Sequence, residues 1–362
     1  MKRFITAAAV ATALFATGPA PAQNANGNLN IYWIDVEGGA STLFVAPNGE
    51  SLLFDTGNPD PNDRDAKRIF AVAQKAGLKQ IDHVVISHWH GDHVGGLPAL
   101  AKMIPIMKFY DHGDAVEDAD KARRDGYRTI AGNKRTILKA GDTIPLAGVQ
   151  VRVMVSEGPV IANPINGGGT NSLCTNTPRM TPAAPENIRM VSLAINYGNF
   201  KMASLADLDW SRELELVCPV NKLGQINLYT INRHGGLDDS GSPAILGAIK
   251  PQVVVINNGP RKGLGQSDDR VKPINADSAT PYERNSYLRL AKNPGIEGIW
   301  QEHLSMIDSD PAHNTSRDMI ANLEDRDKAD HPANYITASV GRDGKFTVTN
   351  SRTGYSKTYT AK

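Results

Sequence analysis

Residues 87–96 read SHWHGDHVGG, and this stretch decides how the rest of the sequence is interpreted. Three of the nine histidines fall here, at His88, His90 and His93, with Asp92 among them. The residues just before it, HVVIS, have the apolar composition of a buried strand. Imidazoles and carboxylates bind Zn²⁺ and similar ions, and the interleaved glycines let the backbone pass close to an ion. We therefore predict a metal-binding loop; a histidine-rich surface loop would not normally follow a buried strand or carry an aspartate.

Length and charge bound the class of protein. The chain has 362 residues, of which 40% are hydrophobic, and a formal net charge of +1. One large domain or two ordinary ones would fit this length. The near-neutral charge argues against a globally basic nucleic-acid-binding protein, so no stable nucleic-acid partner is expected.

The first residues predict export. Residues 1–22 combine a basic start, an apolar run and the small-residue pattern Ala20-Pro21-Ala22, which is typical of a cleaved signal peptide. An uncleaved anchor is the alternative, but the apolar run is short for a membrane span. We expect a periplasmic or secreted protein without a membrane span after cleavage. Cys174 and Cys218, the only cysteines, either pair in that oxidising compartment or remain two thiols.

Hydrophobic patterns place strands and helices along the chain. Strands are predicted over residues 29–36, 41–46, 51–55, 83–87, 106–112, 226–232 and 252–259, with hairpins over 190–206 and 335–350. Helices are predicted over residues 63–76, 97–103, 209–217 and 242–250, and a long loop over 156–187. Strand–helix alternation in two successive sets predicts two sheets with helices outside. His83 and His303 are expected at the surface.

The motif His-x-His-x-Asp-His after a strand resembles the signature of the metallo-β-lactamase fold superfamily. The sequence IYWIDVEGGASTLFVAPNGESLLFDTG resembles the opening of its competence-related (ComEC-like) branch, in which the aspartate corresponding to Asp55 supports the metal loop. VSLAINYGNFKMASLADLDW resembles a hairpin that ends in a glycine–aspartate pair, here Ala206-Asp207. LYTINRHGG resembles a strand end that delivers a last histidine, here His234.

The resemblance implies an αββα sandwich of two mixed sheets. The expected domain spans residues 28–350, with residues 260–350 an extension packed on the core and 351–362 a tail.

The resemblance also implies a two-metal site. The first metal would be bound by His88 and His90, the second by Asp92, His93 and His234, and Asp207 would bridge them. A further histidine usually completes the first site. His112 is the candidate between His93 and Asp207, although it follows a strand earlier than that ligand should, and a partly exposed loop histidine is the alternative.

By this resemblance the chain is a hydrolase that uses a metal-activated water between Asp92 and Asp207, with zinc expected and manganese or iron as alternatives. The substrate would be a small molecule, with a phosphodiester or cyclic ester preferred over a β-lactam. Arg261 and Lys262 could bind a phosphate, or lie in a solvated loop. Alanine in place of glycine at residue 206 and the missing histidine leave a non-catalytic metal- or ligand-binding protein as an alternative, and a di-iron redox protein as a third. The sequence does not define the oligomeric state.

Overall fold

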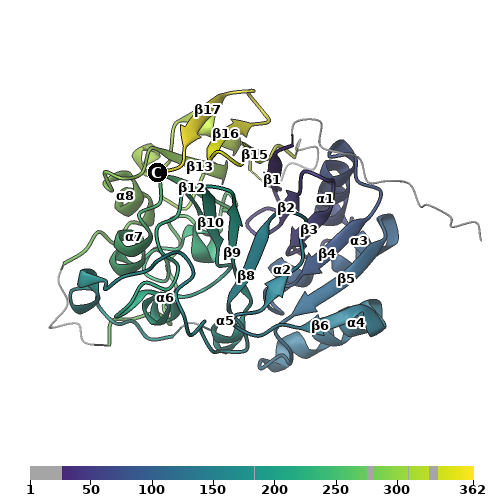
Figure 1. Cartoon of the computed structure of the whole chain (residues 1–362), viewed down its shortest axis with the longest axis horizontal. Helices are drawn as coiled ribbons and strands as arrows, with labels where there is room; N and C mark the ends of the chain where they lie inside the picture. Colours follow the sequence, from purple (N-terminus) through teal and green to yellow (C-terminus); the bar gives the residue numbers. More distant parts are fainter. Residues whose placement is uncertain (1–26, 183, 275–280, 309, 326–332) are drawn as a thin grey trace, which may run out of the picture.

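Two β-sheets stacked face to face form the centre of the molecule (Figure 1). The computed structural model describes residues 27–182, 184–274, 281–308, 310–325 and 333–362. The expected signal peptide, residues 1–22, lies outside the described residues. Within these ranges, no helix is long and apolar enough to cross a membrane.

Both sheets are mixed. Counting described strands, the first sheet has nine, in the order β17 (Ser356–Thr360), β16 (Lys345–Asn350), β15 (Ile336–Val340), β1 (Leu29–Trp33), β2 (Thr42–Val45), β3 (Ser51–Phe54), β4 (Ile81–Val85), β5 (Ile106–Asp111) and β6 (Arg135–Ile137). The second, counted over the same ranges, has eight, in the order β14 (Ile320–Asn322), β13 (Gly298–His303), β12 (Val253–Ile256), β11 (Leu228–Thr230), β10 (Phe200–Ser204), β9 (Ser192–Tyr197), β8 (Gln150–Val155) and β7 (Thr143–Ile144).

Helices cover the outer faces of both sheets. On the first sheet lie α1 (Arg64–Lys75), α3 (Leu97–Met103) and α4 (Lys121–Ala131), while α6 (Trp210–Val217), α7 (Pro243–Ile249) and α8 (Ser286–Ala291) lie on the second (Figure 1). Two short helices lie in loops. The helix α2 (Gly91–Val94) lies between β4 and β5, and α5 (Pro185–Arg189) lies between β8 and β9. This is the αββα sandwich that the sequence predicted.

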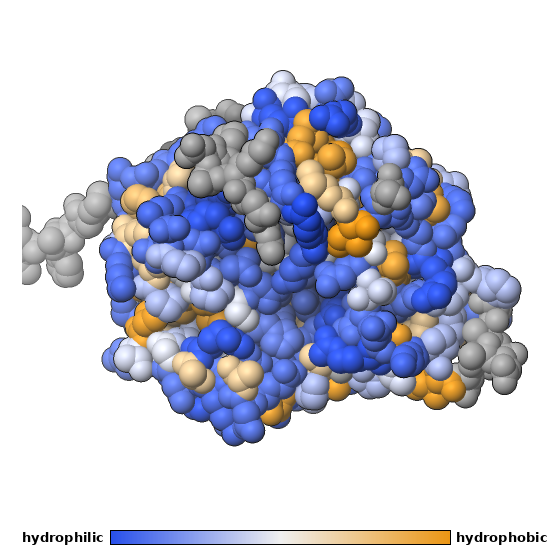
Figure 2. Space-filling model, turned by 180° about the vertical axis from the view of Figure 1, so that it is seen from behind, coloured by the Kyte–Doolittle hydropathy of each residue, from blue (hydrophilic) through white to orange (hydrophobic). Residues whose placement is uncertain are grey.

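Three hydrophobic clusters hold the layers together. The central one joins side chains of both sheets, such as Phe44 and Phe54 from the first with Met202 and Val255 from the second. The outer two lie between each sheet and its helices. The face of the molecule turned toward the viewer in Figure 2 is mostly hydrophilic, with hydrophobic side chains in small scattered groups.

The direction of the strands positions the functional residues. The strands β3, β4 and β5 run parallel in the first sheet, and β10, β11 and β12 run parallel in the second. The carboxyl ends of parallel strands meet at one edge, where loops from both sheets can converge. The loops after β4, β10, β11 and β12 carry the candidate ligands and Lys262.

The structure adds elements that the sequence analysis did not predict. Residues 351–362, expected as a tail, contain β17, which pairs with β16.

His83 and His303, expected at the surface, are buried. His83 lies 3.2 Å from Tyr110 Oη and 3.0 Å from Glu50 Oε1, and His303 Nε2 lies 2.7 Å from Asp35 Oδ1. Their partners come from distant parts of the chain, so no local pattern indicated burial.

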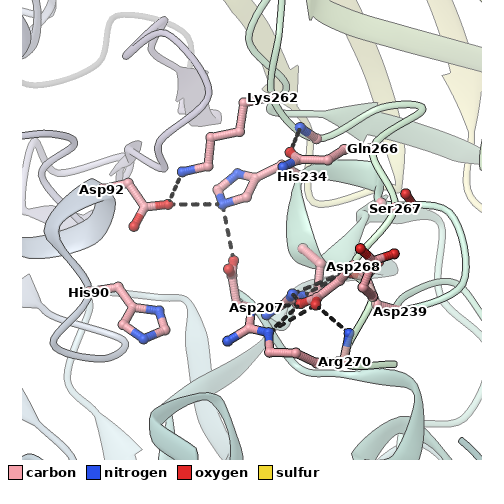
Figure 3. Close-up of a pocket in the computed structure, with 14 residues that line it drawn as sticks. His90, Asp92, Asp207, His234, Asp239, Lys262, Gln266, Ser267, Asp268 and Arg270 are labelled. Atoms are coloured by element: carbon pink, nitrogen blue, oxygen red, sulfur yellow. Dashed lines mark hydrogen bonds and ion pairs between the residues drawn. The ribbon is translucent and has the colours of Figure 1, made fainter. Parts of the chain in front are cut away.

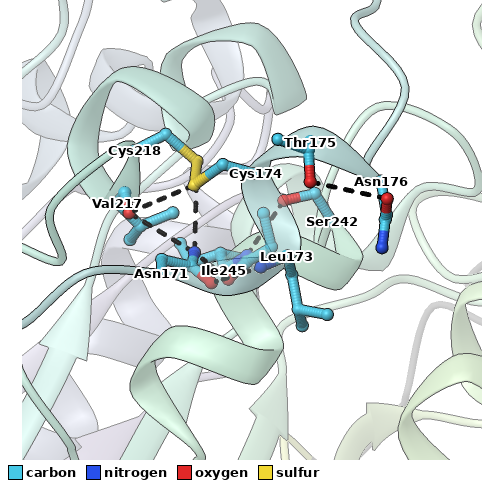
Figure 4. Close-up of a disulfide and its surroundings, with 10 residues drawn as sticks. Asn171, Leu173, Cys174, Thr175, Asn176, Val217, Cys218, Ser242 and Ile245 are labelled. Carbon is cyan, nitrogen blue, oxygen red and sulfur yellow. Dashed lines mark hydrogen bonds between the residues drawn. A yellow bond between two sulfur atoms is a disulfide. The ribbon is translucent and has the colours of Figure 1, made fainter.

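Cys174 and Cys218 form a disulfide in the structure, with Cα atoms 5.7 Å apart (Figure 4). It ties the loop between β8 and β9 to the end of α6. Of the two arrangements left open by the sequence, the structure has the paired one.

Candidate metal centre

Asp55 fixes the loop that follows β4. Its carboxylate is 1% exposed and accepts hydrogen bonds from the Ser87 backbone N–H at 2.7 Å and the Ser87 hydroxyl at 2.8 Å. His93 Nδ1 lies 2.8 Å from Asp55 Oδ2. An imidazole that gives Nδ1–H to a carboxylate keeps its other nitrogen, Nε2, as a lone-pair donor. The Asp55 contact therefore orients the His93 imidazole.

Four of the predicted ligands meet there. His93 Nε2 lies 3.4 Å from Asp92 Oδ2 and 3.4 Å from Asp207 Oδ1. His234 Nε2 lies 3.4 Å from Asp92 Oδ2 and 3.3 Å from Asp207 Oδ1. The four ligand atoms all lie within 4.8 Å of one another. Figure 3 shows the Asp92, His234 and Asp207 side chains turned toward a common point.

These separations fit a metal ion. A tetrahedral zinc with bonds of about 2.0–2.1 Å holds its ligand atoms about 3.3–3.4 Å apart. The Nε2 atoms of His93 and His234 are buried and have no hydrogen-bond partner among the described residues. Such orphaned nitrogens are costly unless something binds them, and a cation satisfies both together with the two carboxylates.

Charge in the cluster favours a cation. Burial raises the pKa of Asp207, but the His234 and His93 imidazoles outweigh this effect and the pKa lies well below its usual value. Burial lowers the pKa of His93, but Asp92, Asp207 and Asp55 outweigh it and the pKa lies well above its usual value. The carboxylates are therefore ionised, and a proton and a metal ion compete for the same imidazole nitrogens.

The two candidate ligands of the first metal lie beside this cluster. His88 Nε2 lies 3.0 Å from His90 Nδ1, and the His88 ring centroid lies 4.0 Å from that of His93. His88 Nδ1 lies 2.9 Å from the Ser87 hydroxyl. Each histidine thus turns one nitrogen toward the other.

His112 belongs to none of the candidate ligand groups among the described residues. Its Nε2 lies 2.8 Å from Glu186 Oε1, and both side chains are buried. Glu186 also accepts the backbone N–H groups of Trp89 and Val116. Trp89 packs against Tyr127 with ring centroids 5.0 Å apart rather than lining the pocket. His112 Nε2 therefore lies against the same Glu186 carboxylate that accepts the Trp89 backbone N–H of the metal loop.

A pocket of about 470 Å³ opens onto the cluster (Figure 3). Its wall includes Lys262, whose ammonium contacts Asp92 Oδ2, and Arg233, which lies 3.0 Å from both Asp239 and Asp268. The sequence analysis singled out Lys262 but not Arg233. Arg233 directly precedes His234, and both have positive φ, 51° and 55°, in the turn after β11. No local pattern predicted that this turn aims both side chains into one pocket.

Part of the chain is similar to a known protein family. Residues 35–172 match the family model "Metallo-beta-lactamase superfamily". Residues 35–172 are therefore similar to the metallo-beta-lactamase superfamily, and the two mixed sheets flanked by helices and the clustered histidines and carboxylates agree with this similarity.

Curated relatives match over short segments. The atrochrysone carboxyl ACP thioesterase dmxR1 of Cryptosporiopsis sp. (strain 8999) is 36% identical over 76 residues, covering 20% of this chain and 23% of the relative. The atrochrysone carboxyl ACP thioesterase of Aspergillus fumigatus is 28% identical over 120 residues, covering 33% of this chain and 24% of the relative. The chain thus spans about a quarter of the length of these relatives. Among solved structures, the metallo-beta-lactamase fold protein YhfI from Bacillus subtilis is 13% identical with a TM-score of 0.40, covering 64% of this chain and 87% of that chain.

Proposed function

We propose that the protein is an exported, metal-dependent hydrolase that cleaves a phosphodiester or a cyclic ester. The observation that carries this proposal is the convergence of Asp92, His93, Asp207 and His234, whose ligand atoms have the spacing of a tetrahedral ion. Two divalent ions, zinc in the first instance, would supply a water of lowered pKa and polarise the substrate oxygen. With Ala206 in place of the glycine of the family pattern, the following Asp207 still reaches the cluster.

The protein's own residues have distinct tasks. Asp55 holds His93 in one tautomer and orientation. The Asp207 carboxylate faces both His93 and His234, so it could serve as a ligand to both ions. Lys262 extends its ammonium to the edge of the cluster, where it can bind an anionic oxygen of the substrate. The pocket above gives the substrate room.

The charge of the pocket supports an anionic substrate. Three basic side chains, Lys262, Arg233 and Arg270, line it with five carboxylates, so the wall alone carries a net charge of about −2 with neutral histidines. Two divalent ions reverse this sign. The loaded pocket then attracts a phosphodiester more strongly than a neutral lactone.

The test is a panel of chromogenic phosphodiester, lactone, thioester and cephalosporin substrates, with and without chelator. We expect phosphodiester cleavage that chelator abolishes and added Zn²⁺, Mn²⁺ or Fe²⁺ restores. Thioesters belong in the panel because the matched relatives are named as thioesterases. Chelator-sensitive cleavage of the lactone alone would select the cyclic ester of the two proposed substrates. Cleavage of the thioester or the cephalosporin alone would contradict both proposed substrates while keeping the metal-dependent hydrolase. No chelator-sensitive turnover with metal bound would indicate the non-catalytic binding protein, and a coloured di-iron centre the redox alternative.

Export has a separate test. The Cys174–Cys218 disulfide fits an oxidising compartment such as the periplasm. N-terminal sequencing of the protein recovered from the periplasm or medium should begin at Gln23. A protein that starts at Met1 and stays in the cytoplasm would contradict the proposed export without touching the metal chemistry.

A further inference from the structure

The first-metal position has few protein ligands. His88 Nε2 and His90 Nδ1 lie 3.0 Å apart, close to the separation of about 3.3 Å between two ligands of one tetrahedral ion. His112, the candidate third histidine, is bound to Glu186 instead. The affinity for an ion at this position therefore depends strongly on how firmly His88 and His90 are oriented and on how well their nitrogens donate electron pairs to it.

The other nitrogen of His90 faces two carboxylates. His90 Nε2 lies 3.7 Å from Glu117 Oε1 and 3.8 Å from Asp120 Oδ2. Asp120 ends the 3₁₀ turn η1 (Asp118–Asp120) and is 1% exposed. Its Oδ2, the oxygen facing His90, is buried and has no hydrogen-bond partner in the part of the chain that the structure describes. A buried carboxylate oxygen without a donor is costly, so this atom is set up to accept one.

Arg123 fixes the direction of that oxygen. The Arg123 guanidinium binds Asp120 Oδ1, and its Nε donates to the Trp89 carbonyl at 2.9 Å. Trp89 lies between His88 and His90 in the chain, so one arginine ties the carboxylate to the backbone of the metal loop. With Oδ1 held, Oδ2 is the oxygen left for His90.

We propose that Asp120 is a positioning residue that accepts the Nε2–H of His90 and thereby fixes Nδ1 as the metal-binding nitrogen, strengthening a first-metal site that lacks a third histidine. A shift of about 1 Å brings Oδ2 within hydrogen-bond range of Nε2. The His90 side chain is 24% exposed and has room for this shift. A carboxylate on the far nitrogen raises the basicity of a ligand imidazole. This inference rests on the proposed metal-dependent function.

The same three side chains suggest a different arrangement, which the tests separate. His90, Glu117 and Asp120 offer ligand atoms within 4.8 Å of one another, so they could in principle bind an ion themselves. A neutral imidazole binds metal through only one nitrogen, because the other carries the proton. His90 Nδ1 is the nitrogen that faces His88. The geometry therefore assigns Nδ1 to the metal and the N–H to the carboxylates.

The first experiment measures metal affinity with a matched control. Wild type, Asp120→Asn and Asp118→Asn are titrated with Zn²⁺ against a chromogenic chelator. Asp118 comes from the same turn, but its side chain is 93% exposed and bound to Lys121. Asp120→Asn should lower the affinity for the zinc ion that binds more weakly or depends on His90 by about 10- to 100-fold. Asp118→Asn should leave the dissociation constants of both zinc ions unchanged. Equal constants in wild type and Asp120→Asn would overturn the proposal.

A double-mutant cycle shows that Asp120 acts through His90. His90→Ala removes the imidazole, so adding Asp120→Asn in that background should cause no further loss of affinity. An equal loss in both backgrounds would mean that Asp120 acts on the ion or the fold by another route, and would overturn the proposal. Circular dichroism of each variant separates a local effect from misfolding.

Nitrogen NMR of the zinc-loaded wild type needs no substitution. In protein labelled with ¹⁵N-histidine, the His90 resonances, assigned through His90→Ala, should show a metal-bound Nδ1 and a protonated Nε2. A metal-bound Nε2 would overturn the proposal in favour of ligation by the carboxylates. If wild type binds no metal at all, the proposed function fails; if it binds metal but the His90 tautomer is reversed, only this inference fails.

Discussion

Asp55 holds the imidazole of His93 by a contact of 2.8 Å between Oδ2 and Nδ1, while the Nε2 of the same ring faces Asp207 at 3.4 Å. One carboxylate thus fixes the tautomer of the imidazole, and the other lies beside the nitrogen that would bind an ion. The two carboxylates come from different sheets, because Asp55 follows β3 and Asp207 follows β10. Stacking of the two sheets is therefore what assembles the centre.

Asp55→Asn should weaken zinc binding by about 10- to 100-fold, because an amide no longer fixes the His93 tautomer and also disturbs the Ser87 contacts. Competition titration with a chelator measures this change. Asp125→Asn, at a side chain that is 60% exposed, is the matched control and should match wild type. Wild-type affinity in Asp55→Asn would contradict the role assigned to this carboxylate.

Lys262→Ala should lower kcat/KM for a phosphodiester by about 10- to 100-fold, the worth of one lost charge-assisted hydrogen bond. The loss should appear mainly in KM and should be smaller for a neutral lactone. Steady-state kinetics on both substrates measures it. Arg261→Ala, at the neighbouring side chain, which is 49% exposed and bound to Asp325, serves as control. A similar loss on both substrates would count against recognition of negative charge by Lys262.

Removal of the disulfide should destabilise the fold. The bridge closes a segment with a sequence separation of 44, and a loop of that size favours folding by about 2–4 kcal/mol. Urea unfolding of the Cys174→Ala/Cys218→Ala variant should show this loss in the free energy of unfolding. Because the bridge lies outside the ligand cluster, the zinc content should not change. Equal stability of the variant and wild type would show that the bridge contributes nothing.

Local sequence patterns predicted the elements that carry the motif, and they failed where partners are distant. The strand before His88 and the helix α3 after it have the hydrophobic spacing of buried elements. The helix has the predicted bounds, and the strand β4 lies two residues earlier than predicted. The strand β13 was not predicted, because its sequence GIWQEH places Glu302 and His303 in positions that are fully buried. Asp35, distant in the chain, partners His303, which no local pattern could indicate. Burial, followed by the nearby Asp35 carboxylate, raises the pKa of Glu302 well above its usual value.

In the candidate site, too, the sequence predicted the residues of a motif but not those brought near by the fold. The four clustered ligands followed from a motif resemblance, whereas Glu117 and Asp120 belong to no motif. Their nearness to His90 arises from the path of the chain between β5 and α4, which composition and spacing do not encode. His112 was a candidate ligand by elimination alone, and its bond to Glu186 could not be read from either residue's neighbours in sequence.

The buried pair His303–Asp35 predicts a pH-dependent stability. Burial lowers the pKa of His303, but Asp35 outweighs it and raises the pKa above its usual value. Burial raises the pKa of Asp35, but His303 and Arg68 outweigh it and lower the pKa. The histidine's contribution is complete below its unfolded pKa of about 6.5 and is lost as pH rises through the folded value. The aspartate's contribution is complete above about pH 4 and is lost as pH falls through its lowered value.

His303→Gln should therefore lower the free energy of unfolding most between about pH 4 and 6.5, by about 1.5–3 kcal/mol, with a smaller deficit at higher pH. Denaturant unfolding of wild type and variant over a range of pH, with Glu37 and Arg68 kept in place, measures the difference. A deficit that does not change with pH would contradict a charged His303–Asp35 pair.

The most direct test of the whole account is the metal content of the purified protein. Wild type, Asp207→Ala, His234→Ala and the control His313→Ala are loaded with Zn²⁺, passed through gel filtration and analysed by plasma mass spectrometry. Wild type and His313→Ala should retain two ions per chain, while Asp207→Ala and His234→Ala should each lose at least one. A wild type that retains no zinc, manganese or iron, or a His234→Ala variant that retains as much metal as wild type, would contradict the claim that these residues form a metal centre.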